Sequence, residues 1–152
     1  MHPIHPEIMN LEQITACLNP YVQHEPTLVS EVSEILKACQ SSKSLMIGIY
    51  LIEKKHFLYC NGSLKRILGE SCPDLLKEGW KFWFSRIDER ELEWIKNTFK
   101  SFFSLPYLQE LLSLKYHISD FLNKRICIRH EILLHRIAGK TIAINYFFDV
   151  TD

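Results

Sequence analysis

The feature that most constrains the fold is an alternation of apolar and polar residues near the C-terminus. Over residues 112–118 every second residue is apolar, and the same period of two returns over residues 124–136. Because the side chains of a strand alternate between the two faces of its sheet, this period predicts two strands with one buried face. We predict tight turns at residues 120–123 and 138–140, and a third strand over 141–149. The inner face of the second strand is predicted to carry Ile126, Ile128, His130, Ile132 and Leu134.

Two further strands are predicted before this meander. Residues 46–52 form an apolar run that is typical of a buried strand, and residues 56–60 follow it after a charged turn. Short helices are predicted over 63–68 and 71–77, each followed closely by a glycine. Strands at both ends of the domain with helices between them indicate the α+β class, with a five-stranded antiparallel sheet and helices on one face.

The longest predicted helix begins at Asp88. Asp88 is a favoured N-cap residue, and Glu91 three residues later completes the pattern of a capping box. Pro106 is expected to stop this helix. Its apolar stripe consists of Leu92, Ile95, Phe99, Phe102 and Phe103. The aromatic side chains just before it fill the core or line a pocket; they are Trp80, Phe82, Trp83 and Phe84.

Residues 1–44 are predicted to form an N-terminal helical extension of the domain at 45–152. Two hypotheses stand for the apolar stripe of its second helix: it forms a dimer interface, or it packs on the domain's own sheet. Substitution of Val32 and Ile35 by Lys, followed by a mass measurement in solution, separates them. The stripe consists of Leu28, Val32, Ile35, Leu36 and Cys39.

Composition excludes several functional classes. The 152 residues fit one domain, and 18 Lys and Arg balance 18 Asp and Glu, which argues against a dedicated nucleic-acid surface. No apolar run approaches the roughly 20 residues of a membrane span. The N-terminus has no pattern of a secretory signal and the cysteines form no CxxC pair, so we expect a cytoplasmic protein with reduced thiols.

Catalytic and metal motifs are missing from the sequence. It contains no GxSxG, HExxH or GxGxxG pattern, so we predict no catalytic residues and no metal site. Cys127, His130 and His135 have the residue types of a zinc site. On one strand, however, Cys127 and His135 face one side and His130 the other, so they cannot converge. His130 itself is either a core histidine bonded to a backbone carbonyl or a tyrosine, or a polar anchor in a ligand cavity.

Four stretches together resemble the PAS domain, the small sensory module of bacterial signalling proteins. Residues 59–69 (YCNGSLKRILG) are similar to the family's strand ending at Asn, short helix and Gly eight residues later. Residues 71–76 (SCPDLL) resemble its S-x-x-E-L turn, 87–92 (IDEREL) its entry to the long helix, and 149–151 (DVT) its closing D-I-T signature. The family's usual Asp-Gly turn is replaced here by residues 120–123 (DFLN).

The resemblance implies a sensory module without a bound cofactor. Flavin-binding members carry a reactive Cys before the long helix, where residues 79–87 have none, and haem-binding members commonly use a His from that helix, where 88–104 have none. We therefore expect only aromatic absorbance. From strand parity and the place of these residues in the family, a small-molecule ligand is expected to contact Tyr50, Phe82, Tyr116 and His130.

The resemblance also implies how the signal is passed to an effector. We expect a homodimer whose Asp149 and Thr151 relay a change to a C-terminal effector, with a DNA-binding transcription regulator as the first hypothesis. With no net charge, this chain should not bind nucleic acid by itself. Two alternatives stay open. One is a stand-alone protein-interaction domain with a packed core, and the other is a small-ligand-binding or isomerase-like α+β protein. An isomerase-like enzyme needs a buried acid or base, and the predicted inner faces carry no carboxylate.

Overall fold

The computed structural model describes residues 30, 34, 45–60, 62–137 and 139–152. The N-terminal boundary at residue 44 and the predicted stripe of the extension therefore lie outside the described residues.

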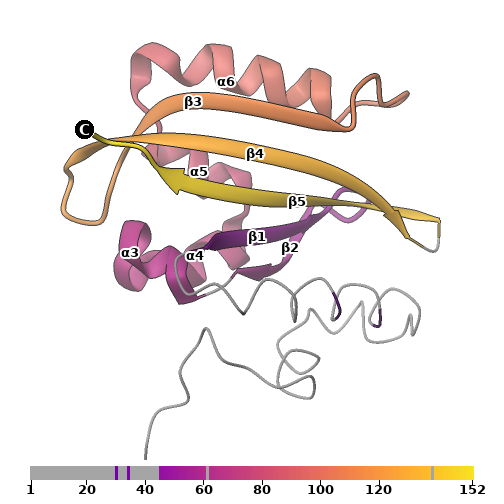
Figure 1. Ribbon diagram of the computed structural model, residues 1–152, viewed down its shortest axis with the longest axis horizontal. Helices are drawn as coiled ribbons and strands as arrows, with labels where there is room; N and C mark the ends of the chain where they lie inside the picture. The colour runs from indigo at the N-terminus through magenta and orange to yellow at the C-terminus, as the bar shows by residue number, and fades with distance from the viewer. Residues whose placement is uncertain (1–29, 31–33, 35–44, 61, 138) are drawn as a thin grey trace, which may run out of the picture.

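One five-stranded sheet forms the body of the domain (Figure 1). Its strands lie in the order β2-β1-β5-β4-β3, and every neighbouring pair is antiparallel. The predicted α+β class and the C-terminal meander are confirmed. The strands are β1 (Met46–Leu51), β2 (His56–Cys60), β3 (Leu111–Ser119), β4 (Arg125–Ile137) and β5 (Lys140–Asp149).

The segment between β2 and β3 is helical, and Figure 1 shows α5 behind β4 and β5. The short helices and the long helix agree with the prediction. The aromatic run before Asp88 is itself a helix, which the sequence pattern did not predict because aromatic residues occupy several sides of it. The helical elements are η2 (Gly62–Leu64), α3 (Lys65–Leu68), η3 (Gly69–Ser71), α4 (Cys72–Glu78), α5 (Trp80–Arg86) and α6 (Glu89–Phe102).

The register of the meander places the alternating residues as predicted. Tyr116 pairs with Ile128, and His130 lies opposite Leu114 on one side and Phe147 on the other. All five of these side chains are buried, in agreement with a single inner face.

The N-terminus of α6 corrects one prediction. Asp88 does cap the helix, because its Oδ1 accepts a hydrogen bond from the Arg90 amide at 2.9 Å. Glu91, however, does not complete a capping box. Its Oε1 accepts from the His117 amide of β3 at 2.9 Å, while the Asp88 amide donates to the His117 carbonyl at 2.9 Å. The neighbouring strand supplies the acceptor that a capping box would have provided, so these bonds tie α6 to β3 instead.

The turn between β3 and β4 forms without the family's glycine. The Asp120 carboxylate accepts from the amides of Leu122 and Lys124 at 2.9 and 2.8 Å, and Asn123 takes the left-handed conformation at φ 62°. Asn tolerates this conformation better than most residues, so it replaces Gly here. The turn also packs on the helical segment, because a Cβ on Gly69 (φ 58°) would lie 2.7 Å from the Phe121 ring.

Candidate functional site

A chain of buried polar side chains connects α5 to three strands. The Trp83 Nε1 lies 2.7 Å from the Tyr116 hydroxyl, which lies 2.7 Å from Nδ1 of His130. The His130 Nε2 lies 2.8 Å from Oδ1 of Asn145. All four residues are completely buried. Four elements, α5, β3, β4 and β5, therefore meet through three side-chain hydrogen bonds in the core.

The chemistry of the donors sets the direction of donation along this series of hydrogen bonds. An indole N–H can only donate, so the Tyr116 oxygen accepts from Trp83 and its own proton goes to Nδ1 of His130. The proton of the neutral imidazole is then on Nε2, which donates to the Asn145 carbonyl oxygen. The Asn145 amide nitrogen donates onward to the Gly48 carbonyl at 3.2 Å and to the carbonyl of Ala143 at 3.1 Å. Each side-chain polar group of the chain therefore has a partner.

Burial also keeps this chain uncharged. Desolvation lowers the pKa of His130 to about 3, against a smaller opposing effect of its hydrogen bond with Asn145. Burial likewise raises the pKa of the Tyr116 hydroxyl above its usual range. At neutral pH neither group carries charge, which suits a structural connection between elements better than proton transfer.

An aromatic cluster centred on Trp80 lies beside the polar chain. The Trp80 ring centroid is 6.0 Å from that of His130, so the two groups are in contact. The Trp80 Nε1 is buried and has no hydrogen-bond partner among the described residues. A buried donor without an acceptor costs about 1–3 kcal/mol. The other rings within 6.0 Å of Trp80, from centroid to centroid, are those of Tyr50, Phe57, Phe99 and Phe103.

The four predicted ligand-contact residues divide into three groups. Tyr116 and His130 are hydrogen-bonded to each other within the polar chain. Tyr50 lies in the aromatic cluster, 5.4 Å from Trp80 between ring centroids. Phe82 is half-buried and packs against the core, and Trp80 rather than Phe82 connects Tyr50 with His130.

Sequence reasoning missed Asn145 and the separate roles of the two tryptophans. Asn145 is an isolated amide in the apolar strand β5, two residues before Phe147 and therefore on its face. That polar interruption mirrors His130 in β4 and could have identified the pair. The missing acceptor of Trp80 has no signal in the sequence, because it depends on how α5 is oriented against the sheet.

The aromatic cluster opens to the surface in a groove of about 560 Å³ between α5, α6 and the β1–β2 turn. Its aromatic surface comes from Trp80 and Phe84 of α5, from Phe99 of α6 and from Phe103, which directly follows α6. Its polar side chains are Lys55, Glu93, Lys96, Asn97, Lys100 and Ser104.

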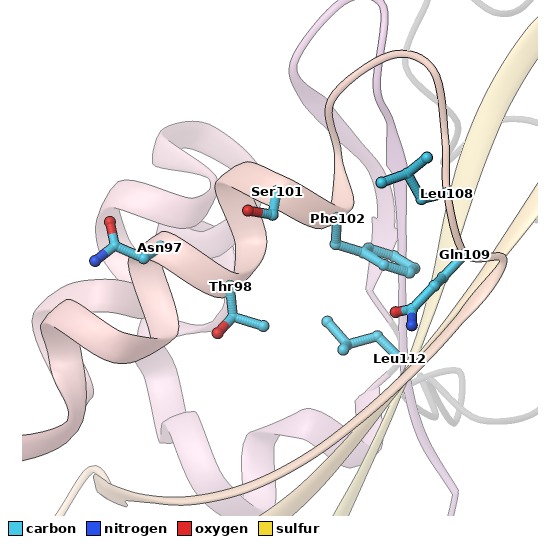
Figure 2. Close-up of a pocket in the computed structure, with 7 residues that line it drawn as sticks. All are labelled: Asn97, Thr98, Ser101, Phe102, Leu108, Gln109 and Leu112. Atoms are coloured by element: carbon cyan, nitrogen blue, oxygen red, sulfur yellow. The ribbon is translucent and has the colours of Figure 1, made fainter.

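A second hollow, of about 420 Å³, lies at the C-terminal end of α6 (Figure 2). Figure 2 shows the Phe102 ring between the helix and the segment that leads into β3, with Leu112 beside it. Leu108 stands at its rim and is 87% exposed. The hollow contains no charged side chain; its polar residues are Asn97, Thr98, Ser101 and Gln109.

The predicted relay residues fasten the end of β5 to β4. The Cys127 amide donates to Thr151 Oγ1 at 2.8 Å, and the Thr151 amide donates to Asp149 Oδ1 at 3.0 Å. The Val150 amide completes the connection by donating to the Cys127 carbonyl at 2.9 Å. The residues that line a third hollow, of about 400 Å³, include Asp149 and Arg66 of α3.

Two negative findings apply to the part of the chain that the structure describes. No group of three or more His, Cys, Asp or Glu side chains there could hold a metal ion. No helix there is long and apolar enough to cross a membrane. His130 is fully buried on the inner face of β4, whereas Cys127 and His135 are half-buried.

No protein-family model matches the sequence, and no curated protein matches it. Solved structures do match. The N-terminal domain of a diguanylate cyclase with a PAS/PAC sensor from Marinobacter aquaeolei superposes with a TM-score of 0.55 at 16% identity, over 70% of this chain and 95% of that one. A PAS domain from a two-component sensor histidine kinase superposes with a TM-score of 0.52 at 12% identity, over 79% and 98%. The chain has the PAS fold.

A third structure has the same fold. It is a domain of the putative light and redox sensing histidine kinase from Haloarcula marismortui, which superposes with a TM-score of 0.57 at 12% identity, over 78% of this chain and 99% of that one. The earlier resemblance to PAS domains is therefore confirmed for the fold. At these identities the comparison establishes only how the chain folds.

Proposed function

We propose that this PAS domain is a non-catalytic sensory module. In this proposal a small ligand is sensed on the helical side of the sheet, and the change is relayed through the sheet to an effector. The observation that carries the proposal is the buried chain from Trp83 through Tyr116 and His130 to Asn145, which couples one helix to three strands.

The path toward the effector runs through Phe147. The Trp83 ring contacts the Phe147 ring at 4.8 Å, and the His130 ring stacks on Phe147 at 4.4 Å, both between centroids. Phe147 lies two residues before Asp149, whose carboxylate holds the Thr151 amide. A shift of α5 therefore acts on the end of β5 through packed rings as well as through hydrogen bonds.

The positions of the carboxylates in the structure fit a non-catalytic role. The inner residues of the polar chain are neutral, and the carboxylate of Asp88 is held by Arg90 and Arg125, which keep its pKa well below the usual range. Glu91 is bonded to His117. The isomerase-like alternative needs a buried acid or base in a cavity, and these carboxylates lie at the entry to α6 instead.

We infer that the module acts as a cytoplasmic homodimer and controls a C-terminal effector, with a DNA-binding transcription regulator as the first hypothesis. The balanced charge of the chain supports an effector that supplies any DNA contact. The amphipathic stripe that includes Val32 and Ile35 supports dimerisation.

A protein-interaction domain with a packed core is the second candidate. It is favoured by one observation: every polar group of the Trp83–Asn145 chain already has a partner, so this part of the core needs no ligand to satisfy it. The two candidates differ in whether a small molecule binds the helical side.

Hydrogen–deuterium exchange tests the relay. Trp83→Phe removes the first donor of the polar chain and retains an aromatic ring. We expect faster exchange of the amides of Cys127 and Val150 than the loss of global stability explains. Phe82→Leu, a core-contacting substitution in the same helix, serves as the control. If the amides that respond to Trp83→Phe are confined to α5 and β3, the relay hypothesis is wrong.

A further inference from the structure

We propose that the groove between α5 and α6 binds an anion with a flat aromatic body. This inference rests on the proposed sensory function, because it names the chemical class of the ligand. The groove opens onto the aromatic cluster around Trp80 and has a volume of about 560 Å³. Small-molecule sites in proteins occupy roughly 300–1,000 Å³ and combine an apolar lining with a few polar groups.

The aromatic surface sets the shape of the ligand. Trp80 and Phe84 are stacked with 6.3 Å between centroids, and Phe99 and Phe103 meet edge to face at 5.6 Å. Aromatic pairs favour offset-stacked and edge-to-face contacts, so these four rings offer both kinds of contact to a planar body. A straight aliphatic chain would gain only the burial of its apolar surface, without these ring–ring contacts.

The charges of the groove set the sign of the ligand. Lys96 and Lys100 lie one turn apart on α6, and Lys55 reaches the groove from the β1–β2 turn. Glu93 is the one carboxylate among the groove residues. Aromatic surfaces alone attract cations, but three ammonium groups against one carboxylate reverse that preference.

The unpartnered donor of Trp80 is an independent sign that the site is incomplete. Its Nε1 is buried without an acceptor among the described residues, while Trp83 in the same helix donates to Tyr116. Buried donors in native proteins are nearly always satisfied, and exceptions mark functional sites or absent partners. An anionic oxygen that enters between Trp80 and its neighbouring rings supplies this acceptor.

Isothermal titration calorimetry with 2-naphthoate tests the proposal. The two control ligands share the naphthalene body: 2-naphthylmethylammonium carries the opposite charge and 2-naphthalenemethanol carries none. We expect 2-naphthoate to bind the wild-type protein about tenfold or more tightly than either control at low salt, and this preference to shrink as NaCl is raised. Equal or tighter binding of the cation, or no binding of 2-naphthoate, overturns the proposal.

Two variants locate the site. Lys96→Glu with Lys100→Glu should weaken 2-naphthoate binding about tenfold or more, since a reversed rim repels the carboxylate. Lys115→Glu with Lys124→Glu makes the same change of charge at exposed residues of β3 and the β3–β4 turn, and it should leave affinity within about twofold. Equal loss in both double variants would mean that only net charge matters, which contradicts a groove site.

Trp80→Phe tests the donor separately from the charges. It removes Nε1 and keeps an aromatic ring, and it should weaken 2-naphthoate more than 2-naphthalenemethanol. An equal effect on both ligands would contradict a contact from the donor to the carboxylate. If 2-naphthoate does not bind but the purified protein retains a different small molecule, the proposed ligand class is wrong while the proposed sensory function is supported.

Discussion

The buried histidine predicts how stability depends on pH. The pKa of His130 is about 3 in the folded protein and about 6.5 in an unfolded chain. Between these values the unfolded state binds one more proton than the folded state, so the free energy of unfolding rises with pH. The contribution is fully present above the unfolded pKa and is lost as pH falls toward 3. One pKa unit corresponds to about 1.4 kcal/mol, so the change from pH 6.0 to 4.5 is about 2 kcal/mol.

Urea unfolding, followed by tryptophan fluorescence at several pH values, measures this contribution. The variant His130→Gln is less stable at neutral pH but has no imidazole to protonate, so its free energy of unfolding should fall less on acidification. The gap between wild type and variant should narrow by about 2 kcal/mol from pH 6.0 to 4.5. His135→Gln controls for loss of a histidine from the other face of β4. Parallel pH profiles for wild type and His130→Gln would refute the reasoning.

Three further predictions concern the core, a turn and the extension. Tyr116→Phe leaves Trp83 Nε1 without its acceptor and His130 Nδ1 without its donor, so it should destabilise the domain by about 2–5 kcal/mol. The control Tyr50→Phe deletes the same hydroxyl outside the polar chain and should destabilise the domain less. Equal losses of unfolding free energy in urea would contradict this prediction. Gly69→Ala should be more destabilising than Gly79→Ala, because both glycines have positive φ but only a Cβ at Gly69 would meet Phe121. Equal melting temperatures of the two variants would show that the contact with Phe121 is unimportant. Val32→Lys with Ile35→Lys should convert a dimer to a monomer in light scattering, whereas an intact dimer would assign the stripe another role.

The parts of the fold that depend on local pattern were predictable. The alternation in β3 and β4 indicates which side chains share the inner face, and it places Tyr116 and His130 on the same side of the sheet. The same parity placed Cys127 and His130 on opposite faces of β4.

The parts that depend on contacts between distant elements were not predictable. Glu91 has the spacing of a capping box but binds His117, because β3 passes beside the start of α6. Asn145 joins His130 from 15 positions away in the sequence, and Trp83 joins Tyr116 across 33. These bonds depend on strand register and on the orientation of α5, which periodicity does not encode.

We propose that this PAS-fold domain senses a small molecule, and native mass spectrometry of protein purified from cells tests this proposal most directly. The account predicts a fraction of the protein whose mass exceeds that of the chain by a small molecule, released on denaturation and reduced in Lys96→Glu with Lys100→Glu. A spectrum with only the mass of the chain, in preparations from both rich and minimal medium, would contradict the claim and favour the interaction domain with a packed core.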